Sequence, residues 1–171
     1  MKERVILLVD DSPSVLNALK RTFRLTGGYR SITAESAREA LDILQEESID
    51  VLITDENMPE MAGTELLRIV RVMYPSVIKM MLTGRTDVEV AKDAINSGQI
   101  YRFFNKPWDD YELLLSVRQA LQQKQLEEEN ARLRATVERQ QEVLKGLEER
   151  NQGITGRESA ESGVAMEDGK A

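Results

Sequence analysis

Five short runs rich in apolar and β-branched residues alternate with five stretches of helical periodicity along the first two thirds of this chain. The runs span Val5–Val9, Tyr29–Ala34, Val51–Thr54, Val77–Leu82 and Ile100–Phe104. Strands that alternate with helices in this way form parallel sheets whose two faces are both covered by helices. The pattern therefore predicts an α/β domain built on one five-stranded parallel sheet.

Two of these runs are more polar than the others, which indicates their place in the sheet. Val5–Val9 is continuously apolar, as is typical of a strand buried on both faces. The run Tyr29–Ala34 is weaker and more polar, and Ile100–Phe104 carries Arg102. We expect both at the sheet edges. The doubly wound, flavodoxin-like strand order 2-1-3-4-5 puts the second and fifth strands there.

The composition excludes several kinds of site. The chain has no Cys and no His, which rules out disulfides, thiolate or imidazole metal sites and Ser-His-Asp catalysis within it. The net charge of −7 argues against direct nucleic-acid binding. The apolar run before Asp10, Val5–Val9, has only five residues, too few for a signal peptide or a membrane span. We expect a cytoplasmic protein without membrane contact.

Polar side chains follow four of the five predicted strands. The residues are Asp10 and Asp11 after the first strand, Asp55 after the third, Thr83 after the fourth and Lys106 after the fifth. Each has a simple structural explanation, since Asp55 and Thr83 suit turns, Asp11 can cap a helix and Lys106 can be a surface charge. The carboxyl ends of parallel strands face one crevice, however, so their convergence favours a functional site.

The residue types at these strand ends suggest a particular chemistry. Three neighbouring carboxylates require a proton or a cation to reduce their repulsion. Mg²⁺ is the natural ion, because it prefers oxygen ligands and the chain lacks His and Cys. The Thr83 hydroxyl and Lys106 ammonium could surround a tetrahedral oxyanion beside Asp55. This arrangement favours phosphoryl transfer onto a carboxylate.

These motifs, in this order, resemble the receiver domain of two-component response regulators. The matching residues are Asp10-Asp11, Asp55 with Met58-Pro59 and Gly63, Thr83-Gly84 and Lys106-Pro107. The resemblance covers roughly residues 3 to 121. It implies a phosphoacceptor switch rather than an enzyme, with self-catalysed phosphoryl transfer and autodephosphorylation only.

The resemblance also implies a role for each residue. Asp55 is the expected phosphoacceptor, taking its phosphoryl group from a phosphohistidine on a histidine kinase or phosphotransfer protein. The expected Mg²⁺ ligands are Asp11, Asp55 and the backbone carbonyl of Asn57, with Asp10 acting through a water. Thr83, Gly84 and Lys106 are the expected phosphoryl-binding residues. Thr83 and Phe103 are the expected switch residues, and the Lys106-Pro107 peptide bond is expected to be cis.

A heptad pattern follows the predicted domain. Apolar residues and one Asn recur at the a and d positions of a coiled coil, with Gln140 at one weak d position. The predicted dimer seam is Leu126, Asn130, Leu133, Val137, Leu144 and Leu147. A buried Asn130 favours a parallel homodimer in one register. The alternative is a single solvated helix that folds back on the domain.

The chain is thus expected to have three parts: a receiver domain over residues 1–121, a coiled-coil extension over 122–150 and a disordered tail or linker over 151–171. No Gly or Pro occurs between Asp109 and Lys145, so we expect the fifth helix to run unbroken into the coil. No recognition helix, zinc module or ATPase motif follows, so no attached output domain is expected within this sequence.

Three other functions fit parts of the pattern less well. A phosphatase with an Asp nucleophile needs a second Asp two residues later, where this chain has Asn57. A dinucleotide-binding domain needs a Gly-rich turn after the first strand, where this chain has Asp10-Asp11-Ser12-Pro13. The remaining alternative is a coiled-coil dimerisation scaffold whose receiver no longer signals, and the intact acidic residues argue against it.

Overall fold

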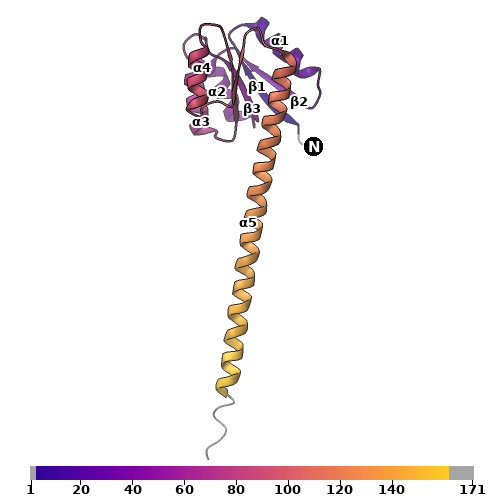
Figure 1. Cartoon of the computed structure of the whole chain (residues 1–171), viewed down its shortest axis with the longest axis vertical. Coiled ribbons are helices and arrows are strands. Elements are labelled where there is room, and N and C mark those ends of the chain that lie inside the picture. Colours follow the sequence, from indigo (N-terminus) through magenta and orange to yellow (C-terminus); the bar gives the residue numbers. More distant parts are fainter. Residues whose placement is uncertain (1–2, 162–171) are drawn as a thin grey trace, which may run out of the picture. The chain divides into compact units, whose positions relative to one another are not determined.

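A parallel five-stranded sheet forms the centre of the first part of the molecule. The computed structural model describes residues 3–161 (Figure 1). The strands are β1 (Arg4–Val9), β2 (Tyr29–Ala34), β3 (Val51–Asp55), β4 (Ile78–Thr83) and β5 (Arg102–Asn105). Their spatial order is β2-β1-β3-β4-β5, and every neighbouring pair is parallel. The predicted strand order and the two predicted edge strands are therefore confirmed.

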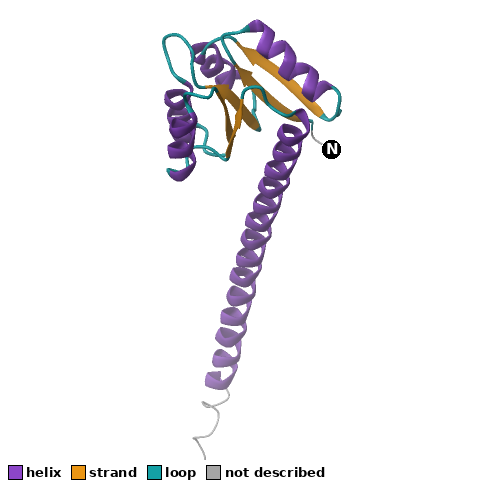
Figure 2. Cartoon of the chain, turned by 45° about the horizontal axis from the view of Figure 1, so that its top comes forward, coloured by secondary structure: helices purple, strands orange, loops and turns teal. Residues whose placement is uncertain are grey.

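Helices cover both faces of this sheet (Figure 2). They are α1 (Pro13–Arg24), α2 (Ala37–Glu46), α3 (Gly63–Met73), α4 (Val88–Asn96) and α5 (Asp110–Glu161). Side chains of α2, α3 and α4 pack on one face, and those of α1 and the first turns of α5 pack on the other. The central strands β1, β3 and β4 are largely buried, and most of their residues are apolar, as is typical of strands covered on both faces.

The register of the strands aligns the ends that carry the polar residues. Val9 lies opposite Thr54, so Asp10 and Asp55 leave neighbouring strands at the same level. Thr83 lies opposite Asn105, which puts Lys106 one residue beyond that pair. The sheet thus brings four predicted strand ends to one edge, as the parallel topology requires.

The sequences Ser36-Ala37-Arg38-Glu39 and Thr86-Asp87-Val88-Glu89 both have the capping-box pattern and predict helix starts at Ser36 and Thr86. The structure confirms the first of these two starts. Ser36 caps α2, since its Oγ accepts a hydrogen bond from the Glu39 backbone N–H at 3.1 Å, as predicted. A second capping box, predicted to begin at Thr86, is wrong. The N-cap of α4 is Asp87, and its side chain makes no capping hydrogen bond. That carboxylate instead accepts a hydrogen bond from the Asn57 side chain.

The chain forms two compact units, and the boundary between them lies within α5, between Gln123 and Lys124. The helix is unbroken at this division, as the lack of Gly and Pro predicts. It continues to Glu161, so residues 151–161 are helical, whereas the composition of this segment predicts a disordered tail or linker from residue 151. Residues 162–171 of that expected tail lie outside the described residues. Among the helices of residues 3–161, none is long and apolar enough to cross a membrane.

Candidate functional site

Three carboxylates meet at the carboxyl ends of β1 and β3. One oxygen from each of Asp10, Asp11 and Asp55 lies within 4.8 Å of the other two. Asp10 is 1% exposed and Asp55 is 5% exposed, whereas Asp11 is exposed to solvent. Two of the three carboxylates are therefore shielded from water. In such a buried position the repulsion between negative charges is screened least.

One ammonium group bridges the two buried carboxylates. Nζ of Lys106 lies 2.7 Å from Oδ2 of Asp10 and 2.9 Å from Oδ1 of Asp55. The backbone N–H of Ser12 donates to the other Asp10 oxygen at 2.9 Å. Lys106 leaves the end of β5 through a cis peptide bond to Pro107, as expected from the resemblance. Both carboxylate oxygens of Asp10 are therefore held by these contacts. Among residues 3–161, one carboxylate oxygen of Asp55 has no ammonium partner.

The surroundings change the ionisation of the bridged pair. Burial raises the pKa of Asp55, Lys106 opposes this rise, and the charge of Asp10 adds to it. Burial disfavours the charged form of Lys106, but its hydrogen bonds to Asp10 and Asp55 outweigh that effect and raise its pKa. The ammonium thus stays charged, while the Asp55 carboxylate is held as an anion less readily than an exposed Asp.

The donor set suits a hard divalent cation. Three carboxylates face a single bridging ammonium, so the cluster has more negative than positive charge. Their oxygens are the ligands that Mg²⁺ prefers, together with carbonyls and waters. A cation here would oppose the burial and the charge of Asp10, which both raise the pKa of Asp55.

The end of β4 completes the rim of the site. Thr83 is fully buried, and its hydroxyl donates to the carbonyl of Gly84 at 3.1 Å. The Thr83 carbonyl accepts the backbone N–H of Lys106 at 2.8 Å. Asp55 pairs with Leu82 in the sheet, so Thr83 is the next residue along the neighbouring strand. The Thr83 hydroxyl thus lies beside the strand that carries Asp55, and its hydrogen bond is to the carbonyl of the next residue in the chain.

The loop after Asp55 is tied down at both sides. Glu56 is 8% exposed, and its carboxylate accepts the Thr64 backbone N–H at 2.8 Å and the Thr64 hydroxyl at 3.0 Å. Asn57 is exposed, and its side-chain amide donates to Oδ2 of Asp87. The first contact anchors the loop to the start of α3, and the second anchors it to the start of α4.

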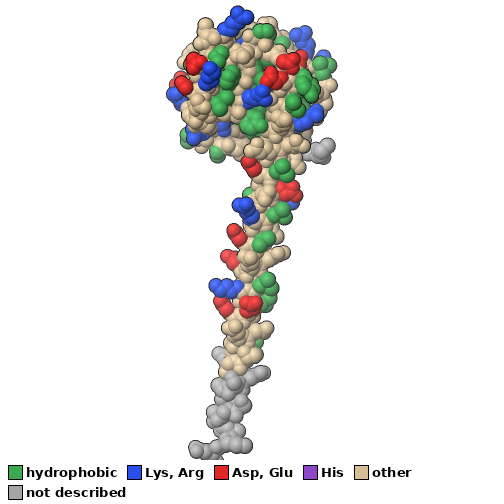
Figure 3. All heavy atoms as spheres, in the orientation of Figure 1, with side chains coloured by type: hydrophobic (Ala, Val, Ile, Leu, Met, Phe, Trp, Pro, Cys, Tyr) green, Lys and Arg blue, Asp and Glu red, His purple; other side chains and the backbone are tan. Residues whose placement is uncertain are grey.

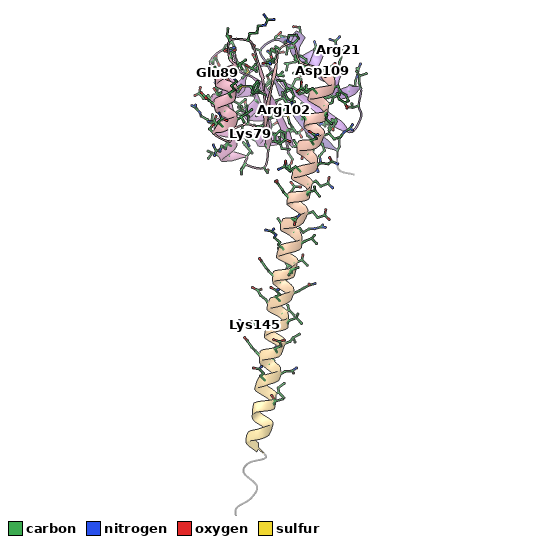
Figure 4. All side chains as sticks on the ribbon, viewed as in Figure 1. Arg21, Lys79, Glu89, Arg102, Asp109 and Lys145 are labelled. Atoms are coloured by element: carbon green, nitrogen blue, oxygen red, sulfur yellow. The ribbon has the colours of Figure 1, made fainter. Side chains whose placement is uncertain are left out.

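Strand β5 connects the site rim to helices on opposite faces of the sheet. Phe103 is half-buried and packs against the cluster that includes α4. Its neighbour Arg102, labelled in Figure 4, donates to the Ser116 hydroxyl of α5 at 3.0 Å and pairs with Glu112. The Arg102 guanidinium also lies over the Phe104 ring, 5.4 Å from its centroid. Adjacent residues of one edge strand therefore contact α4 and α5.

The predicted seam lies in the second unit, on the exposed part of α5. Its apolar members, Leu126, Leu133, Val137, Leu144 and Leu147, are 50–62% exposed. The Asn130 side chain donates to the Leu126 carbonyl of its own helix at 3.2 Å. Figure 3 shows hydrophobic side chains interspersed with charged ones along this helix. In the isolated chain the seam is thus an uncovered apolar stripe.

Some residues that matter to these arrangements were missed from the sequence. The contacts of Glu56 with Thr64 and of Asp87 with Asn57 were not predicted, because both depend on how the loops lie in the fold. Asn151 and Ile154 continue the a and d positions of the heptad, and Ile154 is 57% exposed. The signal for Ile154 was present, since it follows Leu147 by one heptad, but the predicted coil ended before it.

Comparison with known families gives one match over most of the first unit. The family described as "Response regulator receiver domain" matches residues 6–118. This range contains every strand end described above and stops before the predicted seam begins.

Several curated proteins are similar to the chain over a longer range. The hydrogenase transcriptional regulatory protein HoxA of Cupriavidus necator is 34% identical over 77% of this chain. The C4-dicarboxylate transport transcriptional regulatory protein DctD of Pseudomonas aeruginosa is 35% identical over 87% of it. The chain spans only 27% and 32% of the lengths of these two relatives. The response regulator protein TmoT of Ectopseudomonas mendocina is 34% identical, over 84% of this chain and 68% of TmoT.

Solved structures share the fold of the first unit. A signal receiver domain of an HD domain-containing protein from Pseudomonas fluorescens is 38% identical, with a TM-score of 0.68. It covers 72% of this chain and 98% of its own. An adenylate cyclase structure from Rhodopirellula baltica is 35% identical, with a TM-score of 0.71, covering 78% of this chain and 97% of its own.

Proposed function

Because the chain belongs to the response regulator receiver domain family of two-component signalling, we propose that Asp55 is the residue that accepts the phosphoryl group. The observation that carries this proposal is the set of contacts around Lys106. Its ammonium bridges Asp55 and Asp10, with Asp11 completing a cluster of three carboxylates. Within the described part of the chain, Asp55 has one oxygen without an ammonium partner, and that oxygen is the proposed nucleophile.

The proposed reaction transfers a phosphoryl group from nitrogen to oxygen. An Asp55 oxygen attacks phosphorus, an O–P bond forms, the N–P bond of the donor breaks, and the leaving imidazole takes up a proton. The donor histidine belongs to a partner histidine kinase or phosphotransfer protein, because this chain has no His. Lys106 stabilises the charge on the transferred group. Attack by water on the same phosphorus later restores the Asp55 carboxylate.

Mg²⁺ is the proposed cofactor, held directly by Asp11, Asp55 and the backbone carbonyl of Asn57, with Asp10 acting through a water. When bound, it supplies positive charge that reduces repulsion between the carboxylates and an incoming phosphoryl group. The support for this assignment is the donor set, which consists of oxygen ligands with excess negative charge. Lys106 orients Asp55 through its contact with one carboxylate oxygen, and Asp55 is itself only 5% exposed, which limits its contact with water.

Phosphorylation would change the hydrogen bonds at the rim of the site. An acyl phosphate brings additional charge and acceptor oxygens to Asp55. The Thr83 hydroxyl leaves the Gly84 carbonyl and donates to the phosphoryl group, with Gly84 giving room for it. The β4–α4 loop moves together with Thr83, and Phe103 shifts within its cluster beside α4. The contacts of Arg102 with Glu112 and Ser116 then carry the change to α5.

The second unit is the proposed dimerisation element. A parallel two-stranded coil would cover the apolar residues of the seam and also Ile154, with Asn130 and Asn151 at a positions. In that arrangement Glu129 at a g position of one chain faces Arg134 at an e position of the other. Phosphorylation of the first unit would bias this association through the unbroken α5.

A small phosphodonor tests the phosphoacceptor assignment without a kinase. Incubation with acetyl phosphate and Mg²⁺ should add one phosphoryl group to the intact mass of the chain. The Asp55→Asn variant should show no gain, whereas Asp42→Asn, which removes an exposed carboxylate on α2, should gain it like the parent. Equal gain by Asp55→Asn would contradict the assignment, as would no gain by the parent.

A further inference from the structure

A groove between α1 and the edge strand β2 is not used by the proposed phosphotransfer. Its volume is about 710 Å³, and its walls are formed by Asn17, Lys20, Arg21 and Arg24 of α1 and by Tyr29 and Ser31 of β2. None of its lining residues within the described part of the chain is acidic. In a protein with a net charge of −7, this groove is a local concentration of positive charge.

The cations of the groove differ from several others in the first unit. Arg4, Arg30, Lys92, Arg102 and Lys106 each form an ion pair. Among residues 3–161, Lys20, Arg21 and Arg24 form no ion pair with another side chain. Arg21 is labelled in Figure 4. Their spacing of three and four residues puts them on one helix face, where like charges repel one another.

The opposite wall of the groove is an open sheet edge. Among the described strands, β2 pairs only with β1, because it is the outermost strand in the order β2-β1-β3-β4-β5. An edge strand presents backbone N–H and C=O groups that can pair with an extended peptide. Arg30, the cation within β2, is held by Glu47 through two hydrogen bonds of 2.9 and 3.0 Å, so it does not project free charge from this edge.

We propose that this groove binds an extended acidic segment of a partner protein. The segment pairs with the free edge of β2 and directs its carboxylates toward Lys20, Arg21 and Arg24. The position of the last two cations in the final turn of α1 also complements the helix dipole. Complementing the helix dipole requires neither Lys20 nor the adjoining edge of β2. Docking of an acidic strand uses all three cations and this sheet edge.

A small anion and a nucleic acid fit this groove less well. Lys20 and Arg24 lie about one turn apart along α1, a spacing that matches successive carboxylates of an extended peptide better than a single phosphate group. A long nucleic acid would meet the net negative charge of the whole chain beyond the groove. A peptide also gains main-chain hydrogen bonds at the sheet edge, which a nucleic acid does not provide.

Binding of a defined peptide tests the proposal on the full chain. The probe is a fluorescent peptide as long as β2 that alternates Glu and Thr, and its binding is followed by anisotropy. The Lys20→Glu, Arg24→Glu double variant should weaken binding about tenfold or more. Arg38→Glu with Arg68→Glu makes the same charge change at exposed sites on α2 and α3, and should have a much smaller effect. Equal weakening by both pairs would overturn the proposal.

Two further probes separate strand pairing from simple charge attraction. The mirror-image peptide of D-amino acids has the same charge but cannot extend the sheet in the same way, so it should bind about tenfold more weakly. Equal affinity for both enantiomers, or tighter binding of an oligothymidylate of matched charge, would overturn the acidic-strand proposal. Hydrogen exchange of the unsubstituted protein gives an independent readout. The L-peptide should slow amide exchange in Tyr29–Ala34, and unchanged exchange there would also overturn it.

Discussion

A β-carbon on Gly63 would lie 2.1 Å from the carbonyl oxygen of Asp55, closer than any side chain can approach. The Gly63 backbone N–H also donates to the Glu56 carbonyl at 2.9 Å. The first turn of α3 is therefore packed directly against the backbone that carries the proposed phosphoacceptor. Any side chain at this position must displace that backbone.

Gly63→Ala should lower the free energy of unfolding by about 3 kcal/mol, the upper range for a methyl group forced into a close-packed site. It should also slow phosphorylation by acetyl phosphate, because the Asp55 loop must shift. Chemical denaturation and intact-mass kinetics measure the two effects. Gly146→Ala is the control, since that helical glycine has open space around it and should stay within about 1 kcal/mol of the parent. Parent-like stability of Gly63→Ala would contradict the packing described.

Lys106→Met should destabilise the metal-free protein by about 2 kcal/mol, because Asp10 and Asp55 lose their shared cation in a largely buried site. The same variant should bind Mg²⁺ more tightly than the parent, since a competing positive charge is gone. Urea denaturation in chelator and calorimetric titration with Mg²⁺ measure these changes. Lys92→Met, which breaks an exposed pair with Glu89, should cost no more than about 0.5 kcal/mol. Similar losses in the two variants would argue against a special role for Lys106.

Asp55→Asn should stabilise the metal-free protein near neutral pH. Burial raises the pKa of Asp55 in the fold, so its carboxylate opposes folding once it is ionised. The stability contributed by the protonated group is fully present below the unfolded pKa of about 4 and is lost as pH rises through the folded pKa. The advantage of the Asp55→Asn variant should therefore shrink as pH falls through that window. Denaturation at several pH values measures it, and an advantage that grows toward acid would contradict the account. Saturating Mg²⁺ should reduce the stability advantage of the variant. The ion should bind and stabilise the parent more strongly, because only the parent keeps all three carboxylates.

Leu133→Glu should dissociate the proposed coiled-coil dimer, because a charge replaces a central d residue of the seam. Sedimentation equilibrium of the full chain should give a dimer for the parent and a shift toward monomer for the variant. Leu25→Glu is the matched control, since Leu25 is 82% exposed on the first unit and lies outside the seam. A monomeric parent at high concentration, with and without a phosphate analogue, would contradict dimerisation.

Arg102→Leu should uncouple the site from α5 while leaving Asp55 able to accept a phosphoryl group. Leu keeps an apolar contact over Phe104 but removes the contacts with Glu112 and Ser116. Phosphorylation should change hydrogen exchange in the first turns of α5 in the parent, and this change should be reduced in the variant. Arg118→Leu, at an exposed position on α5, should respond like the parent. An unchanged response in Arg102→Leu would remove this residue from the proposed relay.

The sheet and the strand-end residues could be predicted from sequence because their signals are local. A buried parallel strand must be apolar along its length, and its end is marked where Asp10, Asp55 or Thr83 follows. Topology then brings these ends together without further information. The site is therefore predictable as a set of residues, and Lys106 joins it because β5 lies beside β4.

The contacts that fix the loops could not be predicted in the same way. The sequence around Thr86 has the capping-box pattern, but Asp87 is the N-cap and its carboxylate binds Asn57, a partner set by the tertiary fold. From the sequence, Glu56 is expected to be an exposed loop residue. In the structure it is buried and contacts the start of α3. Residues 151–161 contain Gly and little apolar periodicity, yet they continue α5, and no Pro interrupts them.

Chemical mapping of the phosphorylated residue tests the central claim most directly. Borohydride reduces an aspartyl phosphate to homoserine, which marks the modified position permanently. After treatment of the full chain with acetyl phosphate and Mg²⁺, peptide mass analysis should find homoserine at position 55 and unmodified Asp at positions 10 and 11. Homoserine at another carboxylate, or none in a protein that has gained phosphoryl mass, would contradict the assignment of Asp55.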